Sequence, residues 1–169
     1  MKPVVQNKQQ TIHQQGFTLL ELMVVLAIIG ILATVGATQF QNYIARARAT
    51  EGLAAAQPFK LAIEERISTT DGVFKQADLG VPAFTSTGDV TSITVSEMKA
   101  RGNGGVITIT FGPRVGAAGA NTLTLTPVVT AGAIRWFCSA AGVAAPANAN
   151  DGFIAGTLPT EFAPANCRG

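Results

Sequence analysis

The chain has an almost wholly apolar stretch near its start, Gly16–Ala37, with the sequence GFTLLELMVVLAIIGILATVGA. From Phe17 onward this stretch would span about 31 Å as a helix, which is close to the thickness of a bilayer's hydrocarbon core. One carboxylate, Glu21, lies at the fifth position of the run. A carboxylate inside a bilayer costs about 2.5–3.5 kcal/mol at the helix centre and less near the interface. We therefore expect Glu21 to have a specific function.

The residues before the apolar stretch are polar and basic. Residues 1–16, MKPVVQNKQQTIHQQG, contain two lysines and no acid. Positive charge before an apolar span keeps that end of the chain in the cytoplasm, so the later residues are predicted to face outward. An ordinary secretory signal is an alternative, because small residues precede a possible cut after Ala37. The length of the apolar run and the position of Glu21 disfavour that alternative.

The composition limits the classes of protein that are possible. A chain of 169 residues has room for one modest domain beside the apolar helix. The chain has 12 Lys and Arg against 10 Asp and Glu, and Lys2 and Lys8 both precede Gly16. From Phe17 onward the chain is therefore formally neutral. Because it has no cluster of basic residues, the sequence does not predict a nucleic-acid-binding surface.

The sequence offers no convergent set of reactive side chains, which an enzyme would need. The only histidine, His13, precedes the apolar stretch, and no GxxxxGK[ST] phosphate-binding motif occurs. The adjacent acids Glu64 and Glu65 would point apart on a helix, so we interpret them as a solvated face. The sequence thus predicts no enzyme, no cofactor and no metal site. Four aspartates are too dispersed to suggest calcium binding: Asp71, Asp78, Asp89 and Asp151.

Two cysteines, Cys138 and Cys167, lie in the last third of the chain. If this part of the chain lies outside the cytoplasm, one disulfide is the simplest interpretation. Such a bond would stabilise the fold by about 3–4 kcal/mol in the chain-entropy model. The alternative is a pair of unrelated buried thiols. Two cysteines alone cannot complete a zinc site.

An amphipathic helix is predicted at residues 39–69. Leu53 and Ile63 fall near one face of it at helical spacing, and this face is predicted to pack on a sheet. Pro58 is expected to bend the helix gently without ending it. Gly72 suits a left-handed cap just after the helix.

A small sheet is predicted after this helix. Residues 70–105 are expected to form a mostly irregular connection, with a possible short strand at 90–98. Apolar residues then alternate with threonines or other residues, which predicts strands within residues 106–138 and a sheet buried on one side. The strands are expected at 106–111, 122–126 and 134–138.

The start of the chain resembles a known family. Gly16-Phe17-Thr18-Leu19-Leu20-Glu21, followed by a long apolar run, is similar to the cleavage site and membrane segment of bacterial type IV prepilins. The similarity is strongest over residues 14–69. It implies that a prepilin peptidase cuts between Gly16 and Phe17 and N-methylates Phe17. It also implies that Glu21 pairs with the N-terminal amine of a neighbouring subunit and sets the axial register of a filament.

The resemblance also implies an α+β architecture. Residues 1–16 would be a cleaved leader, residues 17–38 a transmembrane and filament-core helix, and residues 39–169 a globular head. In the head, the amphipathic half of the helix would pack on a small antiparallel sheet, and Cys138–Cys167 would bound a C-terminal loop. Many relatives have a proline where this chain has Thr38. We therefore expect residues 30–38 to be a weak part of the helix without a fixed kink.

The function implied by the resemblance is that of a structural subunit of a type IV pilus, which supports adhesion, twitching motility or DNA uptake. The subunit would wait in the inner membrane, N-terminus in the cytoplasm, and then join an extracellular homopolymer. Its other partners would be the prepilin peptidase, the assembly platform, the ATPases and the secretin. A minor pilin or a type II secretion pseudopilin is one alternative. A secreted binding domain released by an ordinary signal peptidase is another.

Overall fold

The computed structural model describes residues 17–70, 72–100, 103–130, 133–147, 149 and 152–169. These residues belong to two compact units, which divide between Thr38 and Gln39. The predicted leader, with His13 and Gly16, lies outside the described residues. The second unit, residues 39–169, is called the head below.

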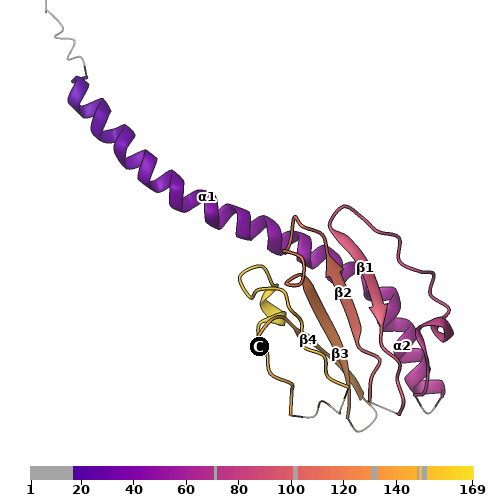
Figure 1. The fold of residues 1–169 in the computed structure, drawn as a ribbon. Helices are drawn as coiled ribbons and strands as arrows, with labels where there is room; N and C mark the ends of the chain where they lie inside the picture. Colours follow the sequence, from indigo (N-terminus) through magenta and orange to yellow (C-terminus); the bar gives the residue numbers. More distant parts are fainter. Residues whose placement is uncertain (1–16, 71, 101–102, 131–132, 148, 150–151) are drawn as a thin grey trace, which may run out of the picture. The chain divides into compact units, whose positions relative to one another are not determined.

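The first unit consists of the start of helix α1 (Leu19–Ala55), drawn in indigo in Figure 1. Leu, Ala, Met and Ile make up most of its sequence and favour a helix. The helix is unbroken through residues 30–38, and the expected weakness of this stretch stays a prediction. Within this stretch the hydroxyls of Thr34 and Thr38 donate to the carbonyl oxygens of Ile31 and Val35, at 2.8 and 2.9 Å.

The second helix, α2 (Gln57–Thr69), begins two residues after α1 ends. Pro58 has no backbone N–H to donate to the preceding turn, and the helix is interrupted just before it, at Ala56. Ala56 nevertheless keeps helical angles, and its carbonyl oxygen accepts from the Lys60 N–H at 3.1 Å. The predicted single helix is thus two helical elements separated by one residue. Gly72 follows them with a φ of 79°, in the left-handed region predicted for it.

The sheet has four antiparallel strands in the order β1-β2-β3-β4 (Figure 1). The strands are β1 (Val90–Val95), β2 (Ile107–Phe111), β3 (Thr122–Thr130) and β4 (Ala133–Ser139). The possible strand at 90–98 forms as β1, so the sheet begins earlier than the range 106–138 predicted for it. The predicted α+β fold, with a long N-terminal helix and an antiparallel sheet, is confirmed.

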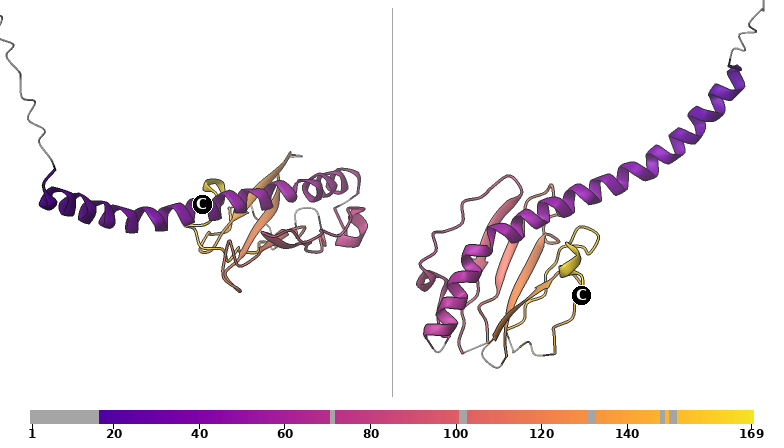
Figure 2. Two further views of the ribbon diagram at one scale, coloured as in Figure 1. Left: turned by 90° about the horizontal axis from the view of Figure 1, so that it is seen from above. Right: turned by 180° about the vertical axis from the view of Figure 1, so that it is seen from behind.

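The core of the head lies between the helices and one face of the sheet. Figure 2 shows α2 and the part of α1 that belongs to the head lying across that face. Ile63 of α2 is fully buried, as are Ile109 and Leu123, which are paired across β2 and β3. Gly52 lets α1 approach closely, because a Cβ there would lie 2.5 Å from the Phe111 ring. The predicted apolar stripe is therefore the core-facing side of the helices.

The opposite face of the sheet is also buried along most of β3 and at the end of β4, so the prediction of a sheet buried on one side is wrong there. Thr124 and Ser139, which are paired across the two strands, are both fully buried. The C-terminal segment covers them: the Thr124 hydroxyl donates to the Ile154 carbonyl at 2.6 Å, and the Gly156 N–H donates to Ser139 Oγ at 3.0 Å. The hydroxyls of Thr124 and Ser139 were expected to face solvent, but they form hydrogen bonds with the backbone of the C-terminal segment.

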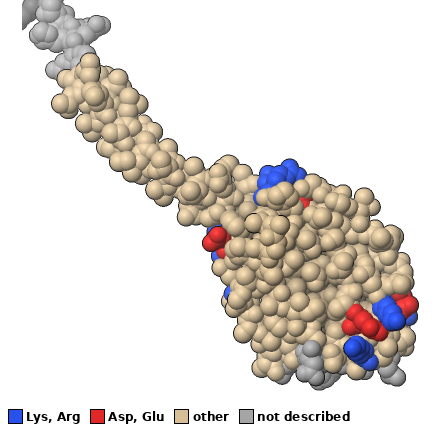
Figure 3. Space-filling view, viewed as in Figure 1, with Lys and Arg blue, Asp and Glu red and all other residues tan. Residues whose placement is uncertain are grey.

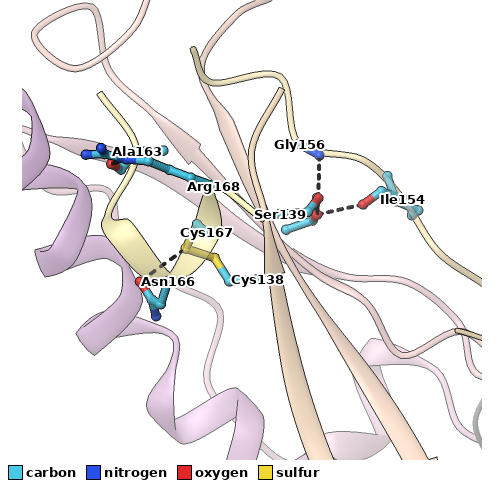
Figure 4. The surroundings of a disulfide bond; sticks show 9 residues. Cys138, Ser139, Ile154, Gly156, Ala163, Asn166, Cys167 and Arg168 are labelled. Carbon is cyan, nitrogen blue, oxygen red and sulfur yellow. Dashed lines mark hydrogen bonds between the residues drawn. A yellow bond between two sulfur atoms is a disulfide. The ribbon is translucent and has the colours of Figure 1, made fainter. Parts of the chain in front are cut away.

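The disulfide between Cys138 and Cys167 is present, with an S–S distance of 1.94 Å and a Cα–Cα distance of 4.6 Å. It joins the end of β4 to a short 3-10 helix, η2 (Ala165–Cys167), as Figure 4 shows. Beside it, the Ala140 N–H donates to the Cys167 carbonyl at 3.0 Å. The predicted disulfide-bounded C-terminal loop is confirmed.

Candidate functional site

The first unit presents an exposed apolar surface along α1. Every residue from Phe17 to Thr38 is exposed, and the Phe17 side chain is 89% exposed. Within the described residues, α1 belongs to the one helical stretch long and apolar enough to cross a membrane, judged by length and composition. Apolar surface of this extent requires lipid or protein around it.

Glu21 occupies the first turn of α1. Its N–H donates to Thr18 Oγ1 at 3.2 Å, so Thr18 caps the start of the helix. A threonine followed three residues later by a glutamate is the arrangement of a capping box. Glu21 therefore lies in a capped first turn, four residues after Phe17. Gly16, the other predicted cleavage residue, lies outside the described residues.

Within the head, two arginines bind the second half of α1 to the domain. Arg46 Nε donates to the Glu161 carbonyl at 2.7 Å. Arg48 forms a salt bridge with Asp89, with Nε 3.6 Å from Oδ1, and Arg114 Nε lies 3.1 Å from the same oxygen. Sequence reasoning missed these contacts, since the partners lie far apart along the chain and no periodic pattern joins them.

The acid pair at Glu64 and Glu65 differs from its prediction as a solvated face. Trp136 Nε1 donates to Glu64 Oε1 at 2.6 Å, and Lys60 Nζ lies 5.4 Å from the centroid of the Trp136 ring. Glu65 is exposed, as predicted. Glu64 therefore connects α2 to β4, a contact that requires knowing which strand the helix crosses.

The remaining surface of the head brings few reactive groups together. On the face shown in Figure 3, Lys, Arg, Asp and Glu side chains form small separate groups in a mostly uncharged surface. A hollow of about 250 Å³ has a mixed polar and apolar lining, which includes Val128, Arg135 and Phe137. Over the part of the chain that the structure describes, no three potential metal ligands cluster.

Comparison with protein families matches most of the chain. Residues 45–168 match the pilin family of bacterial filament proteins, and residues 12–37 match the prokaryotic N-terminal methylation motif. The chain belongs to the pilin family. The resemblance seen in the prepilin-like start is thereby confirmed and extends through the head.

Individual pilins and fimbrial proteins are similar to this chain over different shares of its length. A fimbrial protein of Eikenella corrodens is 40% identical over 131 residues, which cover 75% of this chain and 82% of that protein. A type IV major pilin protein of Neisseria gonorrhoeae is 32% identical over 165 residues, covering 92% and 87%. A type IV major fimbrial protein of Dichelobacter nodosus is 48% identical over 65 residues, covering 38% and 39%.

This pilin is accordingly a structural subunit of a type IV pilus. The family consists of filament subunits, and adhesion or motility is general to it. The methylation motif and the apolar helix imply a membrane-anchored precursor and an extracellular pilus.

Proposed function

We propose that this pilin is a major, polymerising subunit, cut by a prepilin peptidase between Gly16 and Phe17 and then N-methylated at Phe17. The observation that carries the proposal is the exposed apolar surface of residues 17–38, whose helix begins with the Thr18 cap and falls largely within the methylation motif. Similarity to proteins named as major pilins favours a major subunit over a minor pilin or a pseudopilin.

Glu21 is proposed to pair with the Phe17 amine of a neighbouring subunit. Such a pair would be charge-assisted, and inside an apolar bundle it would be poorly screened. Removing one partner from a buried ion pair costs about 3–5 kcal/mol, so the pair would strongly favour one axial register. The Thr18 cap supports this role, because it fixes the backbone that carries Glu21.

Polymerisation would transfer the apolar helix from lipid into a bundle of identical helices. Between helices in an apolar medium, close van der Waals packing is the main attraction, and Gly30 and Gly36 leave open space for it. A head-to-tail contact that does not close gives a filament. The role is structural and needs no catalysis, cofactor or metal by this chain.

The proposed life cycle includes partners and a topology typical of the family. Residues 17–38 would span the inner membrane with the leader in the cytoplasm, and residues 39–169 would form the exported head. The peptidase, the assembly platform, the ATPases and the secretin would act on the subunit in turn. The rival secreted binding domain would begin after Ala37 and would not keep the apolar helix.

Mass spectrometry and N-terminal sequencing of the exported protein test the proposal. Filaments sheared from the cell surface should contain a chain that starts at Phe17, carries one additional methyl group and retains Cys138–Cys167. A chain starting at Thr38, or the absence of this chain from filaments seen by electron microscopy, would contradict it.

A further inference from the structure

Two aromatic side chains stand on the outer face of α1 in the head. Phe40 and Tyr43 are 64% and 69% exposed, although both belong to a unit with a well-formed core. They are three residues apart and therefore neighbours on one helix face. Ala45 and Ala49, on the other side of the helix, are buried. The aromatic pair therefore points away from the head.

Contacts within the head fix this orientation. Arg46 binds the Glu161 carbonyl, and Arg48 binds both Asp89 and the Arg114 carbonyl, the latter at 3.2 Å. By helical spacing these two arginines flank the aromatic face on opposite sides. Because each is held by a different part of the head, the helix cannot easily rotate to bury Phe40 or Tyr43.

We propose that, in the membrane-anchored precursor, Phe40 and Tyr43 lie in the outer interfacial layer of the bilayer and fix the depth at which the head sits. This inference rests on the proposed function only for the existence of an anchored precursor. Aromatic side chains are enriched at membrane–water interfaces, where an apolar ring and a polar edge are both satisfied. Tyr43 has both.

The spacing along the sequence suits this layer. Phe40 and Tyr43 follow Ala37 by three and six residues, and α1 continues through all of them. At about 1.5 Å per residue they would stand about 4.5 and 9 Å beyond the apolar segment. The interfacial layer is about 5–8 Å thick on each side of the hydrocarbon core, so Phe40 would lie within it and Tyr43 at its outer edge. Polar neighbours at 39, 41 and 42, Gln, Gln and Asn, also suit this depth.

Phe40 and Tyr43 directly follow the membrane segment on the same helix. This favours lipid over a second copy of the chain as the first partner of the aromatic face. Leu61 of α2 provides the comparison, because it is an equally exposed apolar side chain, at 65%, but lies far along the chain from the span. A surface meant only for another head would have no reason to follow the span directly. In the filament, neighbouring subunits would replace lipid in contact with this face.

Tyr43 is the only tyrosine, so 3-fluorotyrosine labelling gives one ¹⁹F signal from the unaltered full chain. The chain would be placed at low density in vesicles of phosphatidylethanolamine and phosphatidylglycerol. A spin-labelled lipid with the label near the headgroup should broaden the signal at least twofold more than one labelled at the acyl-chain end. If only a soluble relaxation agent broadens the signal and neither lipid label does, the inference is overturned. Broadening by lipid labels that appears only at high protein density, where a second copy is in contact, would also overturn it.

A matched pair of tryptophan probes gives a second measurement. In a Trp136→Phe background, Tyr43→Trp should show blue-shifted emission and quenching by brominated lipid, whereas Leu61→Trp should show neither. Equal behaviour of the two probes would overturn the inference. If Trp136→Phe does not fold, the ¹⁹F measurement still decides.

The vesicle result is independent of polymerisation. A native chain that starts at Thr38 would remove both the proposed function and this inference. A methylated Phe17 start combined with a water-exposed Tyr43 would remove only the inference.

Discussion

Glu21 is the only charged side chain among residues 17–38, and its effect should be separable from cleavage. We expect Glu21→Ala to leave the cut after Gly16 largely intact, since the apolar run and Phe17 remain. Filament yield should fall more than tenfold, because losing one partner of a buried ion pair costs about 3–5 kcal/mol. Electron microscopy of sheared filaments, with immunoblots of cleaved protein in the membrane, measures both effects.

Glu51→Ala is the matched control for this variant, because Glu51 is an exposed acid on the same helix and within the head. Filaments should form normally with this control. Normal filaments with Glu21→Ala would show that another contact sets the register.

Among the elements, the strands and the amphipathic helix could be predicted, but the cover on the outer sheet face could not. Alternation in β2 and β3 shows which residues share a face, and the helix supplies a partner for the apolar one. It does not show what lies over the threonines. The segment Gly152–Leu158 has no periodicity, so its docking on Thr124 and Ser139 was not visible in the sequence.

For the functional site too, the sequence predicts residues of a contiguous motif but not contacts between distant residues. The start of the chain is a contiguous motif, so Gly16, Phe17 and Glu21 could be proposed directly from it. The contacts that hold α1 to the head, such as Arg48 with Asp89, join residues brought together only by the fold.

The C-terminal segment has two independent attachments, which reduction should distinguish. Reducing Cys138–Cys167 should lower the free energy of unfolding by about 3–4 kcal/mol. The hydrogen bonds from Gly156 to Ser139 and from Leu158 to the Thr122 carbonyl do not require the disulfide. In hydrogen exchange under reducing conditions, the Gly156 and Leu158 amides should stay slow while the Cys167 region becomes fast.

Thr124→Val tests the other attachment. It removes the hydroxyl that donates to the Ile154 carbonyl but leaves the disulfide intact. Here exchange should increase around residues 152–156. If reduction alone releases the whole segment, the strand hydroxyls are not a separate attachment.

For the whole molecule, the residues of the described core and those proposed to drive assembly lie in different parts of the chain. Among the described residues, the buried apolar side chains all lie between Ala45 and Cys167, within the head. The residues from Phe17 to Thr38 contribute none of them. The head can therefore be stable by its own core, while the apolar segment gains its favourable free energy only from lipid or from other subunits.

A chain of residues 39–169 should therefore fold alone as a soluble monomer, because it contains every buried apolar side chain of the described residues. Its radius of gyration should be about 14–16 Å, as for a compact domain of this length. The Cys138–Cys167 bond and the near-ultraviolet circular dichroism of Trp136 should match those of the full chain in detergent. The truncated chain should neither enter vesicles nor form filaments. Size-exclusion chromatography with X-ray scattering tests this, and an unfolded or aggregated head would show that the apolar helix contributes to the fold itself.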